Sequence, residues 1–389
     1  MPRKQIVGPV ILPLLLSGLL IQALVPMVRI LTSYRALDEG HGPGMIGLLS
    51  AAFSLLPVFL TLALGRLNDR GAVGGVILAG AAGVLGACLV FWLGPVSLAT
   101  LFVASTLLGI GQTAVLSGLQ VATMRASTRA HRDAILGNYM VAISLGQAIG
   151  PAIVGFRLDS GDVAILPAGA AVLLLLTTAL VARRLPRPPG AIDRPVAALR
   201  EIAATRGLWW IVIFGSLCVT AQDLLLAFLP VYGIERGLSP ATVGLLLAVR
   251  AVAAMVSRLM FGWAVHRVGQ MRLALLSAGL GGGAMMGMVV PLPVAATAVA
   301  MAATGFGLGV ALTCSVALTM EIAPRRARGT ALSIRMTAIR LAQFLLPLGA
   351  GLVVAPLGAA GTFALSGVAI LGATWMRPGG ITGSGGRRL

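Results

Sequence analysis

Ionisable and amide side chains inside long apolar stretches are the residues of this sequence best suited to chemistry. Asp223, preceded by Gln222, lies deep in the apolar run of residues 208–232. A charge at bilayer depth costs about 2.5–3.5 kcal/mol on insertion scales, so it indicates a functional site. A carboxylate that alternates between wet and dry surroundings can take up and release a proton. Asp223 is therefore predicted to carry a proton or bind a cation, with a fixed structural ion pair to an arginine as the alternative.

Three arginines also lie within apolar runs and could surround a negatively charged ligand. Arg250 and Arg340 lie near the middle of their runs, and Arg29 lies in the outer half of the first run. Arg340 and Gln343 are three residues apart, so they share a helix face. Arginines that line one cavity favour an anionic or zwitterionic ligand. The alternative for each is a bond to Asp223, a carbonyl or a lipid phosphate. Weaker polar candidates in other runs are Gln22, Gln112 and Gln147.

Twelve apolar runs position these residues. A helix needs about 20 apolar residues to cross a bilayer core of about 30 Å. Runs of this kind occur near residues 8–31, 44–64, 73–94, 97–119, 137–157, 163–182, 208–232, 241–262, 272–291, 294–317, 331–353 and 357–376. The chain is 58% hydrophobic and 10% charged, against roughly 25% charged residues in soluble domains. The sequence predicts an all-α membrane protein with twelve transmembrane helices, and excludes a soluble enzyme, a secreted disulfide scaffold and a disordered chain.

The basic residues predict the orientation. Most of the 29 Lys and Arg fall in alternate connections, and such connections face the cytoplasm. Both termini are then cytoplasmic, and the opposite face receives only Arg35, Arg157 and Arg236. Arg258 and Arg335 lie nearer the cytoplasmic ends of their runs and are expected to extend toward the membrane surface. The net charge of +18 thus reflects topology, and the use of arginine in place of lysine indicates a bacterial inner membrane.

The two halves of the sequence resemble each other. A shift of about 196 residues aligns several unusual positions, which is the mark of an internal repeat. The aligned positions include Gly109 and Gly305, Gln147 and Gln343, and Pro151 and Pro347. Parallel repeats of this kind are typical of transporters that work by alternating access. We expect two pseudo-symmetric six-helix bundles (1–182 and 207–376), a cytoplasmic linker (183–206) with a short surface helix at 196–205, and a cytoplasmic tail (377–389).

The connection after the second run carries a recognisable motif. Residues 65–71 read GRLNDRG, which resembles the beginning of the G-x-L-x-D-R-x-G-R-[KR] loop signature of the major facilitator superfamily. Its final Gly and basic residues are replaced by Ala72, Val73 and Gly74. The second copy has His266 in place of the acid. The signature positions are Gly65, Asp69, Arg70, Gly262 and Arg267. The resemblance implies that Asp69 holds the start of the eleventh helix near Gly329 and steadies an outward-open state, with a solvated topology signal as the alternative.

The fifth run contains a second motif. Its positions are Gly137, Gly146, Gly150, Pro151 and Gly155. They resemble the G-x8-G-x3-GP-x2-GG motif of proton antiporters in the same superfamily, with Val154 as the one departure. The resemblance implies a place at the interface between halves and an association with export. The alternative is close helix packing, which serves a symporter equally well. Helix four of many members carries an arginine where this chain has Ser105.

The leading functional hypothesis is a secondary transporter that exports a small organic molecule by proton-coupled antiport. The alternative is a proton symporter or facilitator that imports an organic anion, which the arginines favour. A non-transport membrane protein on a transporter scaffold is a more distant alternative. The expected partners are a small-molecule substrate, protons and the lipid bilayer, for a monomer without a nucleic-acid partner.

Enzymatic activity is not expected. The sequence has no G-x-x-x-x-G-K-[ST] nucleotide loop and no nucleophile–base pair. Its cysteines show no CxxC spacing and its three histidines fall in connections, so they do not indicate a metal site. We therefore predict no catalytic residue, no metal and no cofactor, and no ATP-driven pumping within this chain. The cysteines are Cys88, Cys218 and Cys314.

Overall fold

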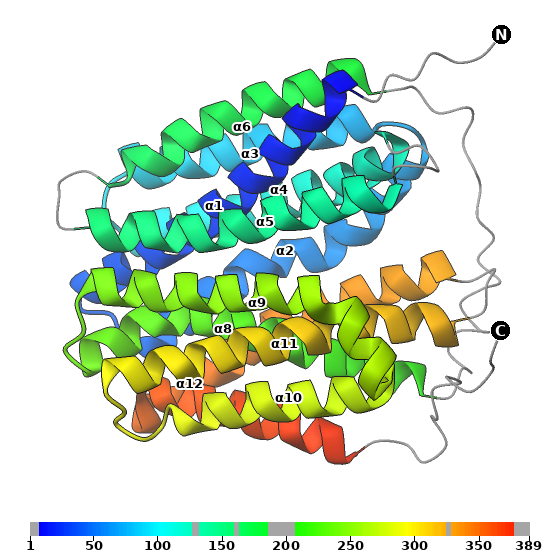
Figure 1. Cartoon of the computed structure of the whole chain (residues 1–389). Coiled ribbons are helices and arrows are strands. Elements are labelled where there is room, and N and C mark those ends of the chain that lie inside the picture. Colours follow the sequence, from blue (N-terminus) through cyan, green and yellow to red (C-terminus); the bar gives the residue numbers. More distant parts are fainter. Residues whose placement is uncertain (1–7, 127–131, 159–162, 186–206, 324–327, 377–389) are drawn as a thin grey trace, which may run out of the picture. The chain divides into compact units, whose positions relative to one another are not determined.

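The protein is helical throughout the part that its computed structural model describes, residues 8–126, 132–158, 163–185, 207–323 and 328–376 (Figure 1). These residues form eleven helices and no strand. The helices are α1 (Gly8–Asp38), α2 (Pro43–Asp69), α3 (Val73–Leu93), α4 (Leu98–Ala126), α5 (Arg132–Arg157), α6 (Ile165–Arg184), α8 (Leu208–Glu235), α9 (Pro240–Val268), α10 (Gln270–Gly287), α11 (Val294–Ile322) and α12 (Arg328–Trp375).

The last helix, α12, is two helices in succession. They meet at Gly358, whose φ of 66° and ψ of −176° lie outside the helical region and favour glycine. Each of the twelve expected runs therefore corresponds to a helix, and ten of these are long and apolar enough to cross a membrane. A bilayer offers no water to backbone groups, so spanning segments satisfy them within helices. The predicted all-α membrane fold with twelve helices is confirmed.

The chain forms two compact units. Unit 1 comprises Met1–His41 and Leu49–Asp193, and unit 2 comprises Gly42–Leu48 and Arg194–Leu389. The first turns of α2 belong to unit 2, where a side chain at Gly47 would collide with the backbone of Pro347 and Gly351 in α12. Most of the predicted linker, its surface helix at 196–205 and the tail at 377–389 lie outside the described residues.

Equivalent close contacts between helices occur in both units. In unit 1 a side chain at Gly109 of α4 would collide with the carbonyl oxygen of Phe53 in α2. In unit 2 a side chain at Gly305 of α11 would collide with the carbonyl oxygen of Arg250 in α9. Small residues permit such backbone approach, which holds helices together in membranes. The predicted duplication thus extends to the packing, and Phe53 and Arg250 are equivalent positions.

An arginine at the end of the first helix of each unit binds the end of the third. Arg35 of α1 donates a hydrogen bond to the carbonyl oxygen of Phe91 in α3 and lies 4.0 Å from the centroid of its ring. After α8, Arg236 donates to the carbonyl oxygen of Val289 at 3.1 Å, just beyond α10. A cation at the C-terminal end of a helix offsets the negative end of its dipole. Two of the three arginines predicted for the face opposite the cytoplasm thus have a structural role.

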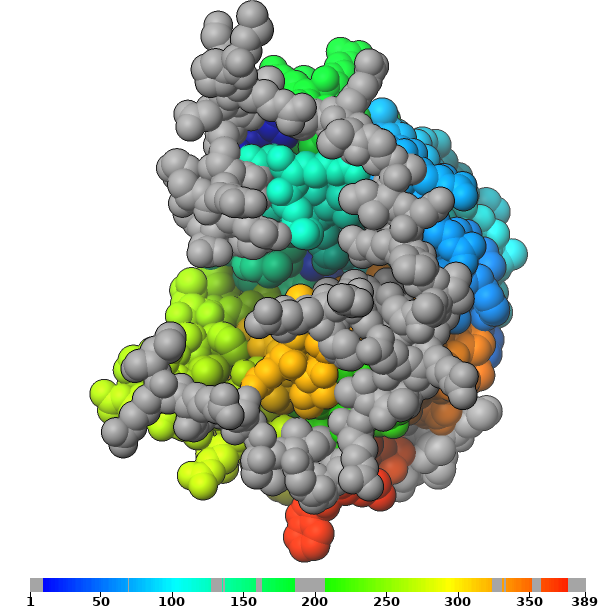
Figure 2. Space-filling model, turned by 90° about the vertical axis from the view of Figure 1, so that its right-hand side faces the viewer, coloured from blue at the N-terminus to red at the C-terminus, as the bar shows by residue number. Residues whose placement is uncertain are grey.

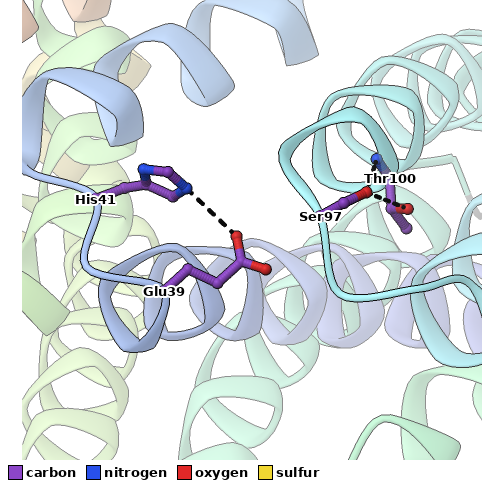
Figure 3. A network of polar contacts seen from close by, with 4 residues as sticks. All are labelled: Glu39, His41, Ser97 and Thr100. Carbon is purple, nitrogen blue, oxygen red and sulfur yellow. Dashed lines mark hydrogen bonds and ion pairs between the residues drawn. The ribbon is translucent and has the colours of Figure 1, made fainter.

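Side-chain contacts occur at one helix start and in one short connection of unit 1. Ser97 precedes α4, and its Oγ accepts a hydrogen bond from the backbone N–H of Thr100 at 3.3 Å (Figure 3). This is the usual position of a helix N-cap. In the short connection between α1 and α2, Nε2 of His41 lies 3.4 Å from Oε2 of Glu39 (Figure 3). These contacts let turns of a few residues reverse the chain.

The break at Gly358 is stabilised by an acidic residue from α8. Both carboxylate oxygens of Glu235 accept from the backbone N–H of Ala359, at 3.0 and 3.1 Å. A carboxylate at a helix N-terminus satisfies an N–H group without an intrahelical partner and interacts favourably with the helix dipole. Glu235 therefore joins the end of α8 to the start of the last helix.

Adding a methyl group at Gly109 tests the close packing of α2 and α4. We expect Gly109→Ala to lower stability by about 1–3 kcal/mol, because the helices have to separate to admit the methyl group. Gly86→Ala in α3 is the matched control, since nothing lies within 4 Å of a Cβ at that position. Thermal unfolding of both purified variants in the same detergent checks this. An equal or higher stability of Gly109→Ala would contradict the contact.

Removing the carboxylate at Glu235 tests the cap at the break in α12. We expect Glu235→Ala to reduce stability by about 1 kcal/mol and Glu235→Gln by less, because the amide keeps an acceptor but loses the charge. Asp38→Asn, which removes an exposed carboxylate at the end of α1, serves as the control. Thermal unfolding of the purified variants checks this. A melting temperature of Glu235→Ala equal to that of wild type would show that the cap does not stabilise the protein.

Candidate functional site

The acidic residue in the middle of α8 is linked to α12 by a glutamine. Asp223 is half-buried, and its Oδ2 accepts a hydrogen bond from Nε2 of Gln343. Oε1 of Gln343 accepts in turn from Nη1 of Arg340 at 3.1 Å. Gln343 is 7% exposed, and a buried amide requires partners for its polar atoms. The predicted shared face of Arg340 and Gln343 is confirmed, and the amide joins a guanidinium to a carboxylate.

A second arginine reaches α8 from α9. Arg250 is 6% exposed, and its Nη1 donates to Oε1 of Gln222 at 3.2 Å. Asp223 is close enough to Arg250 for their charges to interact. Successive residues of a helix point about 100° apart, so Gln222 meets α9 while Asp223 meets α12. Three candidates from the sequence, Asp223, Arg250 and Arg340, thus lie in one polar cluster, which also contains Gln222 and Gln343.

The polar cluster contains donors that lack an acceptor. Nε of Arg250 and Nε2 of Gln222 are buried, and neither has a hydrogen-bond partner among the described residues. Both atoms can only donate. Leaving a buried donor unsatisfied costs about 1–3 kcal/mol, and more for a charged group. The cluster therefore has unused capacity to bind an acceptor.

The remaining polar candidates lie in unit 1. Arg29 of α1 lies over the ring of Phe53, 4.8 Å from its centroid. Three half-buried glutamines, on α1, α4 and α5, are joined to one another by no hydrogen bond among the described residues; they are Gln22, Gln112 and Gln147. Because Phe53 is equivalent to Arg250, unit 1 has an aromatic ring where unit 2 has a charge.

The glycines of the fifth helix pack against α1. A side chain at Gly146 would collide with the carbonyl oxygen of Leu19, and one at Gly150 with that of Ala23. Gly137 is exposed, with nothing within 4 Å of a Cβ, whereas Pro151 and Gly155 are buried. Close packing inside unit 1 accounts for Gly146 and Gly150 without reference to the direction of transport.

The first loop signature lies mainly on a helix. α2 continues to Asp69, so Gly65 and Asp69 occupy its last turns and Arg70 the following turn. The side chain of Asp69 and the surroundings of Gly329 lie outside what the structure describes. The predicted contact between them stays a prediction.

The second copy of the signature occupies the end of α9. Gly262 and Arg267 are exposed there, and Arg267 lies 5.2 Å from the ring centroid of Trp263. Figure 2 shows the end of unit 2 at which α9 and α11 terminate. Both copies thus form helix ends and not extended loops.

Two polar contacts next to the first signature escaped the sequence argument. Asn68 is 2% exposed, and its Nδ2 donates to Oγ of Ser117 in α4 at 3.3 Å. Arg125 of α4 donates from Nη2 to the carbonyl oxygen of Asn68 at 3.0 Å. Arg125, which the sequence analysis treats only as a basic residue of a connection, therefore binds the end of α2. Asn68 occupies a position of the signature at which any residue is allowed, so the motif did not indicate these contacts.

The expectation for Arg335 is wrong. Its side chain is 2% exposed and buried within unit 2, and does not extend to the surface. Nη2 lies 3.4 Å from the position that a Cβ of Gly215 would take. Arg335 therefore packs close to Gly215 of α8, and the hydropathy of the eleventh run does not indicate this burial.

Two hollows lie within the units, and no residue of the polar cluster lines either of them. One of about 260 Å³ lies between α1 and α5, and one of about 290 Å³ lies between α8 and the two parts of α12. Leucine and alanine form most of their walls, and no charged residue lines either hollow. Specific binding of a small molecule needs a few placed polar groups, so the polar cluster is the better candidate site.

Solved structures of transporters resemble this chain along nearly its whole length. A mutant of the nucleoside transporter NupG has a TM-score of 0.78 at 12% identity, over 94% of this chain and 98% of that chain. A POT family transporter in complex with 5-aminolevulinic acid has a TM-score of 0.75 at 13% identity, over 94% of both chains. A bacterial homolog of the human lysosomal transporter Spinster, inward-facing and unoccupied, has a TM-score of 0.69 at 13% identity, over 96% of this chain and 95% of that chain. These likenesses show a shared fold.

Sequence comparison gives the family. No curated protein matches the sequence. The family model of the Major Facilitator Superfamily matches residues 10–347 and 235–379, so it extends through both units and includes every residue of the polar cluster. The chain therefore belongs to the Major Facilitator Superfamily of membrane transporters.

Proposed function

We propose that this chain is a proton-coupled secondary transporter of a small organic molecule, in which Asp223 carries the proton. The observation that supports it is the hydrogen-bonded series Arg340–Gln343–Asp223 in the middle of unit 2. Membership of a transporter family gives the alternating-access framework. Transport, and no chemical conversion of the substrate, is the proposed activity.

Asp223 is suited to proton exchange by its position. Among the described acidic residues it alone lies in the middle of a span, whereas the others lie at helix ends or in turns. Its neighbours include the positive charge of Arg250 and the amide of Gln343. Gain or loss of a proton therefore changes the charge balance of the whole cluster. A change of this kind gives two states that bind a substrate differently, and coupling requires such a difference.

Two directions of transport are consistent with a proton on Asp223. The resemblance of the fifth helix to antiporters favours export by exchange, as expected from the sequence. The two arginines of the polar cluster favour uptake of an organic anion. A substrate that competes with the proton gives antiport, whereas one that binds together with it gives symport.

We extend the proposal to the setting of the protein. Basic residues at alternate helix ends support termini that both lie in the cytoplasm, and the use of arginine in place of lysine supports a bacterial inner membrane. Described examples at these ends are Arg66, Arg70, Arg125, Arg183, Arg184, Arg267 and Arg272. Both six-helix halves lie in one chain, so we propose a monomer whose partners are substrate, protons and lipid, without nucleic acid.

A pH-sensitive dye inside proteoliposomes tests this function. Amines, nucleosides and carboxylates are added outside, one at a time and at equal pH on both sides. We expect at least one compound to change the internal pH in wild type, with acidification indicating symport and alkalinisation indicating antiport. The change should be lost in Asp223→Asn, because the amide cannot carry a proton at this site.

Glu39→Gln is the matched control, because it makes the same chemical change outside the polar cluster. It should behave as wild type. Isotope uptake measured in parallel separates coupling from transport. Substrate flux without a pH change in wild type, or an unchanged pH response in Asp223→Asn, would contradict the proposed role.

A further inference from the structure

We infer that Arg250 and Gln222 form the binding site for an oxyanion of the substrate, such as a carboxylate, phosphate or sulfonate group. This inference rests on the proposed function and adds the substrate class and the sense of coupling. The proposed anion site lies beside the proton site, because Gln222 and Asp223 are consecutive in α8. The proton and the anion then bind the same few residues at separate atoms.

The geometry of the donors supports an anion. Oε1 of Gln222 is occupied by Nη1 of Arg250, which directs the remaining amide group, Nε2, away from that bond. Nε2 and Nε of Arg250 are then two buried donors without an acceptor among the described residues. A guanidinium binds carboxylate and phosphate oxygens through parallel hydrogen bonds. An oxyanion has several acceptor oxygens, which suits a site with more than one unsatisfied donor.

The charges around Arg250 also favour an anion. From α9 itself, the charge of Arg258 acts on Arg250. α8 contributes the carboxylate of Asp223, and α12 contributes Arg340 through Gln343. Positive groups therefore outnumber the one carboxylate. Protonation of Asp223 removes that carboxylate's charge, so an anion binds more favourably when the proton is present. The anion and the proton are then carried in the same direction, which is symport.

The comparison of the two units separates binding from packing. The backbone at Arg250 makes the same close contact with Gly305 that the backbone at Phe53 makes with Gly109. Unit 1 makes this contact without a charged side chain. The packing of these helices therefore does not require an arginine at position 250. A buried guanidinium with an unsatisfied nitrogen is costly, which supports a role in binding.

Matched probes that differ only in charge test the inference. The probes are benzoate with benzamide, succinate with succinamide, and inorganic phosphate, sulfate and methanesulfonate. We expect at least one anion to raise the melting temperature of the purified wild-type protein and its neutral analogue to have no such effect. Arg250→Gln should weaken this binding at least tenfold, and Arg250→Lys should weaken it less, because the ammonium keeps the charge but not the paired donors.

Gln222→Glu tests the site with Arg250 intact. The new carboxylate accepts from Arg250 and repels an oxyanion, so anion binding should be lost while the protein still folds. Arg272→Gln, which removes an exposed arginine of unit 2, should bind as wild type. Asp223→Asn should retain anion binding and lose the pH response.

Failure of the inference can be told from failure of the proposed function. The anion site is overturned if no anion raises the melting temperature of wild type. It is also overturned if an anion raises the melting temperatures of wild type, Arg250→Gln and Gln222→Glu equally. Internal alkalinisation on adding an anion overturns the symport. In these cases a pH response that depends on Asp223 and is produced by amines or nucleosides leaves the proposed function standing. An unchanged response in Asp223→Asn overturns the proton site, whatever the anions do.

Discussion

The close backbone approach of α9 and α11 at Gly305 determines where the charge of Arg250 lies. Because the glycine has no side chain, the carbonyl group of Arg250 rests directly against α11. This contact places the guanidinium inside unit 2, where it finds a partner on α8 and not in water. Gln222 accepts a hydrogen bond from Arg250 and precedes Asp223 in α8. Gln343 then links Asp223 to Arg340, which completes the polar cluster.

α8 is the helix on which the chemistry converges. Two consecutive residues contact different neighbours, Gln222 through α9 and Asp223 through α12. A small rotation or translation of α8 therefore alters both contacts together. The amide of Gln343 is suited to such a change, because it can donate to a carboxylate and accept from a guanidinium without a charge of its own. This gives a physical route by which a proton and a substrate influence each other.

The two units illustrate how a duplicated fold acquires a specific site. Equivalent glycines hold equivalent helices together, and an arginine at the end of each first helix binds the end of the third. The side chains of the cluster are repeated only in part, since Gln147 is equivalent to Gln343 but Phe53 occupies in unit 1 the position of Arg250. Packing imposes the same backbone requirement on both halves, whereas it leaves the chemistry of the side chain free to differ.

The sequence by itself determined the twelve helices, the duplication and the identity of most charged residues that lie within apolar runs. Apolar runs have to be helices in a bilayer, and a rare charge within them is costly, so both features can be recognised from composition alone. The shared face of Arg340 and Gln343 also followed, because spacing along one helix defines its faces. The limits of α2 did not follow, since polar residues can continue a helix beyond the apolar run.

Only the tertiary structure decided which side chains meet. Gln222 is the partner of Arg250, Gln343 lies between Arg340 and Asp223, and Arg335 is buried within unit 2 instead of reaching the surface. Periodicity places a residue on its own helix but does not tell which distant helix packs against it. That choice depends on the close fit of backbones at small residues, in which segments far apart in the chain take part together.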